Sequence, residues 1–115
     1  MHDARHTVLT IELKDNSSAK AFADLLKAGD VTLHLADYGG FEKVGDLPKT
    51  LPRNDVDIRT HPGDVILYLG KHICLYYATN EWRFTRLGRI TNPDPQSLRQ
   101  VFGPADIDVT FRLKR

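Results

Sequence analysis

Hydrophobic and polar residues alternate in several short segments of the chain, which is the pattern of β-strands that bury one face. The clearest case is residues 7–13, in which Leu9, Ile11 and Leu13 share one face and Val8 lies on the other with polar residues. The alternation and the turn residues between segments predict about eight short strands, at residues 7–13, 30–35, 41–44, 56–60, 64–69, 72–77, 84–90 and 107–113.

Two other segments carry helix signals. Apolar residues spaced three and four apart predict a helix over residues 18–28, and Asn16-Ser17-Ser18 supplies oxygens for its N-cap. A second, shorter helix is predicted to start at Asp94 as N-cap, with Pro95 in the first helical position, and to stop at Gly103. A mainly β chain with two short helices predicts a closed antiparallel β-barrel, because closure leaves no exposed sheet edge.

One turn predicts a strand register. Leu69-Gly70-Lys71-His72 has the composition of a two-residue hairpin loop with glycine at its first central position. In that register one face of the hairpin carries Ile66, Tyr68, Ile73, Leu75 and Tyr77, and the other carries Val65, Leu67, Leu69, His72, Cys74 and Tyr76. Both faces are largely apolar, so we expect a helix, a loop, a partner or a ligand to cover the second face.

Length and composition narrow the class of protein. A chain of 115 residues fits a single domain over residues 1–115. A net charge of +1 predicts no affinity for nucleic acid. The single cysteine, Cys74, excludes an intramolecular disulfide and favours a reducing compartment, so we expect a cytoplasmic protein. No segment approaches the roughly 20 apolar residues of a membrane span, so no membrane association is expected.

Candidate binding residues come from a concentration of aromatic side chains and from two charges within apolar strands. Tyrosine and tryptophan favour the boundary between a core and a wet groove, where they also bind ligands. Glu42 and Arg86 fit either a solvated strand face with ordinary ion pairs or a ligand site. Trp82 falls in a predicted loop at residues 78–83, where it either lines a groove or caps the barrel end. The predicted groove consists of Tyr38, Phe41, Glu42, Tyr77, Trp82 and Arg86.

Other chemistry has little support in the sequence. His72 and Cys74 share one face of a strand, but structural zinc needs about four ligands and catalytic zinc about three, so no metal site is predicted. Gly39-Gly40 is too short to cradle phosphates, and no nucleotide or flavin motif is present, so no cofactor is predicted.

Several blocks of the chain together resemble the bacterial cyclophilin-like domain family. They are Phe41-Glu42-Lys43-Val44-Gly45, Leu51-Pro52, Asn54-Asp55, Pro62-Gly63-Asp64, Leu67-Tyr68 and Thr85-Arg86-Leu87-Gly88-Arg89-Ile90. The resemblance implies a barrel of about eight strands with two helices, in agreement with the pattern above. It implies no particular reaction, and some members of that family are joined to a flavodoxin-like domain.

Prolyl isomerases of this fold place an arginine on the strand after the first helix and a glutamine shortly before a Gly-Gly pair. Here that strand is Val31-Thr32-Leu33-His34-Leu35, and Asp37-Tyr38 precedes the glycines, so both catalytic residues are missing from their expected places. We therefore expect a non-catalytic domain that binds a peptide or a small ligand. Two alternatives stay open: a prolyl isomerase with a relocated arginine, such as Arg53 or Arg86, and an interaction module for a flavodoxin-type redox partner that carries the flavin itself.

Overall fold

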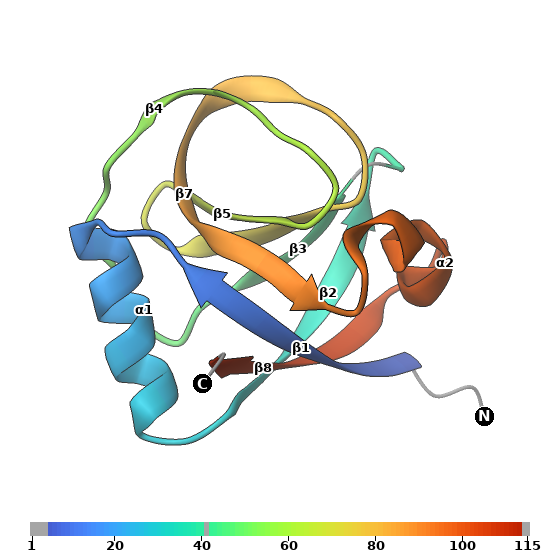
Figure 1. Ribbon diagram of the computed structural model, residues 1–115, viewed down its shortest axis with the longest axis horizontal. Helices are drawn as coiled ribbons and strands as arrows, with labels where there is room; N and C mark the ends of the chain where they lie inside the picture. The colour runs from blue at the N-terminus through green and yellow to red at the C-terminus, as the bar shows by residue number, and fades with distance from the viewer. Residues whose placement is uncertain (1–4, 41, 114–115) are drawn as a thin grey trace.

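The computed structural model describes residues 5–40 and 42–113, and its strands close into a barrel (Figure 1). The mainly β fold class with about eight strands and two short helices is confirmed. The strands of the described residues are β1 (Arg5–Leu13), β2 (Val31–Tyr38), β3 (Glu42–Asp46), β4 (Val56–Arg59), β5 (Asp64–Tyr68), β6 (His72–Tyr76), β7 (Glu81–Asn92) and β8 (Ile107–Leu113).

Seven of these strands form the closed ring, and β4 lies outside it. The order is β1-β8-β2-β3-β6-β5-β7, and pairing of β7 with β1 closes the barrel, while β4 pairs with β7. Six of the pairs in the ring are antiparallel, but β1 and β8 run parallel, with Arg5 opposite Ile107 and Ile11 opposite Leu113. The alternation within a strand does not specify the direction of its neighbour, so the sequence pattern did not reveal this parallel pair.

The helical segments are α1 (Ser17–Lys27), a single 3₁₀ turn η1 (Pro95–Ser97) and α2 (Leu98–Phe102). The predicted N-cap Asp94 is confirmed, and Asn16 is the residue of the predicted Asn16-Ser17-Ser18 segment that caps α1. The side chain of Asn16 accepts the backbone N–H of Ala19 at 2.7 Å, and that of Asp94 accepts the backbone N–H of Gln96 at 3.1 Å. Figure 1 shows α1 and α2 on opposite sides of the barrel. None of the helices in the described ranges is long and apolar enough to cross a membrane.

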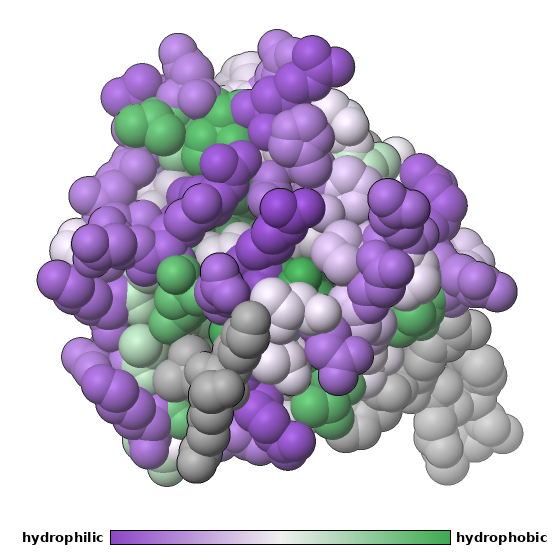
Figure 2. Space-filling view, viewed as in Figure 1, coloured by the Kyte–Doolittle hydropathy of each residue, from purple (hydrophilic) through white to green (hydrophobic). Residues whose placement is uncertain are grey.

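The main core fills the barrel and holds both helices against it. The ring of Phe22 in α1 meets that of Phe111 in β8 edge-on, with centroids 5.8 Å apart. On the side of α2, Phe102 meets Tyr77 in the same way at 6.0 Å. Outside, most of the face seen in Figure 2 is hydrophilic, and hydrophobic residues form only small separate patches on it.

The hairpin between β5 and β6 corrects the predicted register by one residue. Tyr68 pairs with His72, so the loop has three residues, Leu69, Gly70 and Lys71. Its turn is closed by the Lys71 N–H, which donates to the Tyr68 carbonyl at 3.2 Å. Leu69 and Gly70 have φ angles of +57° and +73°, so glycine takes the second central position of a turn in which both are left-handed. The predicted two-residue loop was therefore wrong.

This shift regroups the side chains of the hairpin, because a slip of one residue turns the side chains of one strand to the opposite face relative to those of its partner strand. Val65, Leu67, Ile73, Leu75 and Tyr77 all belong to the main core inside the barrel. The opposite face, which we call the outer face of the hairpin, carries Ile66, Tyr68, His72, Cys74 and Tyr76.

A two-stranded ribbon, β4 with the first part of β7, covers the outer face. Ile58 of β4 and Phe84 of β7 pack there in a second, smaller hydrophobic cluster. The expectation that a second layer lies on this face is confirmed, and the layer is a ribbon of the chain itself. Hydrogen bonds of 2.7 and 2.8 Å between Thr60 and Asn80 tie the end of β4 to the segment before β7.

Trp82 lies in this ribbon, so its predicted place in a loop was wrong. β7 starts at Glu81, and Trp82 pairs with Ile58 of β4. The segment is a strand because it pairs with β4, where Asp57 lies opposite Arg83 and Arg59 lies opposite Glu81. The local sequence does not reveal this pairing.

Candidate functional site

A groove of about 400 Å³ lies between the ribbon and the outer face of the barrel sheet, and we call it the outer groove. Its size is typical of small-molecule sites. β2 and β3 supply one side, β5 and β6 the floor, and β7 the opposite side. The lining residues are Tyr38, Glu42, Val44, Tyr68, His72, Cys74, Tyr76, Asn80, Trp82 and Phe84.

Glu42 provides the only carboxylate among the described residues that line the outer groove. As the first residue of β3, it pairs with Tyr38 on one side and with Tyr76 on the other, so all three side chains project from the same face of the sheet. The residue is 7% exposed. Its carboxyl group accepts hydrogen bonds from Tyr76 and Cys74, yet its Oε2 atom is buried without a hydrogen-bond partner in the described part of the chain.

Burial shifts the pKa values of Glu42 and of two neighbouring groups, Cys74 and Tyr76. Burial raises the pKa of the Glu42 carboxyl above its usual value, although the hydrogen bonds from Tyr76 and Cys74 act in the opposite direction. Burial, together with the nearby carboxylate, also raises the pKa of the Cys74 thiol and of the Tyr76 hydroxyl. Both groups therefore stay protonated at neutral pH and act as hydrogen-bond donors, and Cys74 is not an activated nucleophile.

Aromatic rings form much of the wall and the rim. Tyr68 and Tyr76 each lie 5.8 Å from Phe84, measured between ring centroids, so the three rings form one connected surface. Tyr38 and Trp82 stand at the opening and are 63% and 62% exposed. These two side chains are accessible to a ligand that enters the groove.

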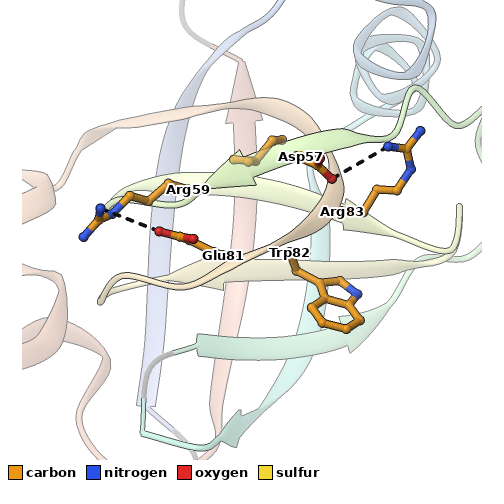
Figure 3. Close-up of a pocket in the computed structure, with 6 residues that line it drawn as sticks. Asp57, Arg59, Glu81, Trp82 and Arg83 are labelled. Atoms are coloured by element: carbon orange, nitrogen blue, oxygen red, sulfur yellow. Dashed lines mark ion pairs between the residues drawn. The ribbon is translucent and has the colours of Figure 1, made fainter.

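A second hollow, of about 580 Å³, follows the ribbon and is lined by Asp57, Ile58, Arg59, Glu81, Trp82 and Arg83. Its four charged side chains pair with one another across the strands, Arg59 with Glu81 at 3.6 Å and Asp57 with Arg83 at 3.7 Å. Figure 3 shows the Arg59–Glu81 pair at the left and the Asp57–Arg83 pair at the right, while the Trp82 indole points away from both. The charges here are already matched and exposed, which makes this hollow a weak candidate for a binding site.

The structure brings together three of the predicted groove residues, Tyr38, Glu42 and Trp82. Tyr77 is not among the groove residues, because the corrected register turns it into the barrel core, where its hydroxyl donates to Asp37. Phe41 lies outside the described residues.

Arg86 is also absent from the lining of the outer groove. Its Nη2 atom lies 3.1 Å from Asp64 Oδ2 and 3.4 Å from the Arg59 carbonyl, and it borders a separate hollow on the other side of the ribbon. Arg53, the other arginine considered for a relocated isomerase site, pairs with Asp55 at 2.5 Å. Neither arginine therefore lines the outer groove.

Sequence reasoning missed the other seven residues of the groove lining, namely Val44, Tyr68, His72, Cys74, Tyr76, Asn80 and Phe84. A signal for part of it was present, because the hairpin was apolar on both faces. The register error spread the even-numbered side chains over two faces, so that they did not stand out as one lining.

Comparison with known proteins places the chain in a family. Searches among curated proteins and among solved structures give no significant match to this sequence. A family model does match, over residues 3–112, and that range includes every strand and helix described above except the last residue of β8, Leu113. The chain therefore belongs to the Cyclophilin-like family.

Proposed function

We propose that this chain is a non-catalytic binding domain that holds a small ligand, or a side chain of a peptide, in the outer groove. The observation that carries the proposal is the buried Glu42 carboxyl, whose Oε2 atom lacks a partner in the part of the chain that the structure describes, at the base of a groove lined by aromatic rings. A polar group left unsatisfied in a folded protein costs free energy, and a ligand donor that meets it recovers that cost.

The other polar groups of the groove favour binding over catalysis. The raised pKa values of Cys74 and Tyr76 keep both groups protonated. The Nδ1 atom of His72 lies 2.5 Å from Asp46, so that ring nitrogen is engaged outside the groove lining. The lining therefore offers hydrogen-bond donors, one carboxyl group and aromatic surface, which are the elements of recognition.

Fluorescence of Trp82, the only tryptophan, tests the proposal directly. A panel of peptides and metabolites is screened for binding by protein NMR, and each binder is then titrated against Trp82 emission. We expect binders to change the emission of Trp82 and to shift the backbone amide signals of β3 and β6. If every confirmed binder leaves Trp82 and both strands unaffected, the groove is not the binding site.

A pair of variants on the same strand provides the control. Trp82→Ala removes a rim residue of the groove, whereas Arg83→Ala, at the next position, removes a side chain that faces Asp57 on the other side of the ribbon. We expect NMR titrations to show weaker binding only for Trp82→Ala. Equal losses in both variants would contradict a site in the groove.

The absence of catalysis is measured separately with a protease-coupled assay on a proline-containing peptide at high protein concentration. We expect the isomerisation rate to equal the uncatalysed rate. An acceleration that disappears in Arg53→Ala or Arg86→Ala would overturn the non-catalytic assignment and support a relocated arginine.

A further inference from the structure

We propose that the outer groove recognises an organic cation, an alkylated ammonium group that lies against the aromatic rings and pairs with Glu42. This inference rests on the proposed function and names the chemical class of its ligand. Three features carry it: the charge of the lining, the chemistry of its walls and the size of the groove.

The charge of the lining favours a cation. Among the described residues, Glu42 is the only acidic one in the groove lining, and no lysine or arginine belongs to it. Its hydrogen bonds come from the neutral donors Tyr76 and Cys74, and Oε2 has no partner among the described residues. A buried carboxylate without a compensating charge is costly, so a ligand that brings a positive charge gains most from this site.

The walls favour an alkylated ammonium group over a metal ion. The faces of aromatic rings attract cations, and this attraction is strongest where water is excluded. Five of the ten lining residues are aromatic: Tyr38, Tyr68, Tyr76, Trp82 and Phe84. Calcium and magnesium require several oxygen ligands and give up their bound water reluctantly. A single carboxyl group among aromatic rings does not supply that number of oxygen ligands. Methyl or methylene groups around the nitrogen match the apolar surface while the charge faces the carboxylate.

The groove volume of about 400 Å³ accommodates a trimethylammonium group together with an attached chain. The exposed rings of Tyr38 and Trp82 stand at the opening, where the remainder of the ligand would emerge. The cation is therefore expected to be the buried end of a longer molecule. Both a free alkylammonium compound and an alkylated side chain of a peptide carry such a cation.

Three probes of nearly equal shape separate charge from size. Choline has a trimethylammonium head group, and 3,3-dimethylbutan-1-ol and 3,3-dimethylbutanoate have a tert-butyl group of the same shape. The net charges of the three molecules are positive, zero and negative, and the negative charge is on the carboxylate at the other end of the anion. We expect choline to bind about tenfold more tightly than the alcohol, as measured by NMR titration, and the anion to bind most weakly. Equal or tighter binding of the alcohol or the anion, or no binding of choline, overturns the inference.

Two variants test which residues of the groove recognise the cation. Glu42→Gln keeps the shape of the side chain and removes its charge, so it should lower the affinity for choline to that for the alcohol and leave the alcohol unchanged. Trp82→Leu keeps an apolar rim but removes the ring, and should weaken choline about threefold with little effect on the alcohol. Because Trp82 is largely exposed, this variant is expected to fold even if Glu42→Gln does not.

The outcomes distinguish this inference from the proposed function. If neutral or anionic compounds bind in the groove and Glu42→Gln does not weaken choline, the ligand class is wrong but the groove remains a binding site. If no compound of the broad panel affects the groove, the proposed function itself fails. Choline that shifts signals elsewhere on the protein, with Trp82→Leu unchanged, also overturns the cation site.

Discussion

Buried Lys43 and half-buried Asp37 form an ion pair across β3 and β2, with 3.0 Å between Lys43 Nζ and Asp37 Oδ1. The lysine is completely buried, and its ammonium group also donates to the backbone carbonyls of Gly103 and Ala105, just after α2. Because successive side chains of a strand point to opposite faces, Lys43 projects away from the groove that holds Glu42. Adjacent residues of β3 thus place a satisfied cation in the core and a partly unsatisfied acid in the outer groove.

Replacement of Lys43 should be strongly destabilising. Lys43→Met leaves Asp37 without its ion-pair partner and two carbonyl groups without a donor, so we expect a loss of about 3 to 5 kcal/mol in the free energy of unfolding. Urea denaturation measures this loss. The control is Lys49→Met at an exposed position, which should change stability by less than about 0.5 kcal/mol. Similar effects of the two substitutions would contradict the structural role of Lys43.

The same ion pair predicts a dependence of stability on acidic pH. Partial burial acts to raise the pKa of Asp37, but hydrogen bonds from Tyr77 and Lys43 outweigh it and hold the pKa below the ordinary value of 3.8. The folded state therefore binds this proton less tightly than the unfolded state. Its stabilisation is present above the ordinary pKa and is lost as the pH falls through the lowered one.

Asp37→Asn should remove that acid-dependent contribution. We expect the wild type to be more stable than the variant at neutral pH, and the difference to shrink as the pH falls below about 4. Unfolding free energies at a series of pH values measure it. A difference that stays constant down to the acid transition would show that Asp37 does not contribute through its charge.

The raised pKa of Glu42 predicts a dependence of stability on pH that is opposite to that of Asp37. Because burial raises its pKa above the ordinary value of 4.5, the folded state binds the proton more tightly than the unfolded state. Stability should therefore decrease as the pH rises from that value through the raised pKa. Relative to Glu42→Gln, the wild type should lose stability over this interval in urea denaturation. Parallel pH profiles for the two proteins would mean that Glu42 titrates as an exposed acid does.

Substitutions of Trp82 and Arg86 should show that Trp82 contributes to ligand binding and that Arg86 contributes to stability. Trp82→Ala removes a side chain that is 62% exposed, so we expect it to cost less than half of the roughly 3 to 5 kcal/mol of a buried aromatic residue. Arg86→Ala removes the cation beside Asp64, whose side chain is 8% exposed, and should cost about 2 kcal/mol.

Denaturant midpoints with unchanged slopes measure both effects, and ligand titration provides the second readout. Arg86→Ala should be less stable and bind normally, while Trp82→Ala should be nearly as stable as the wild type and bind weakly. The reverse assignment would place the binding site in the hollow that Arg86 borders.

The elements themselves were predictable because their signals are local. The alternation of Leu9, Ile11 and Leu13 predicted β1, and the caps Asn16 and Asp94 predicted where the helical segments start, since each depends on residues close in sequence. The boundaries shifted by a few residues, as in β2, which continues from the predicted end at Leu35 to Tyr38. The fold class and the family resemblance followed from the same local blocks.

The residues that line the candidate site were harder to predict, because their positions depend on the conformation of a turn and on the pairing of strands. Leu69 adopts a left-handed conformation that its type disfavours, and the resulting three-residue loop decides which hairpin residues line the groove. Trp82 belongs to a strand because β4 pairs with it. The sequence by itself determined the strands, the helices and three of the groove residues. Only the tertiary structure decided the parallel β1–β8 pair and the position of Arg86, because their partners lie far away along the chain. Only the structure also decided the register of the hairpin, because it depends on a left-handed conformation of Leu69 that the residue type does not favour.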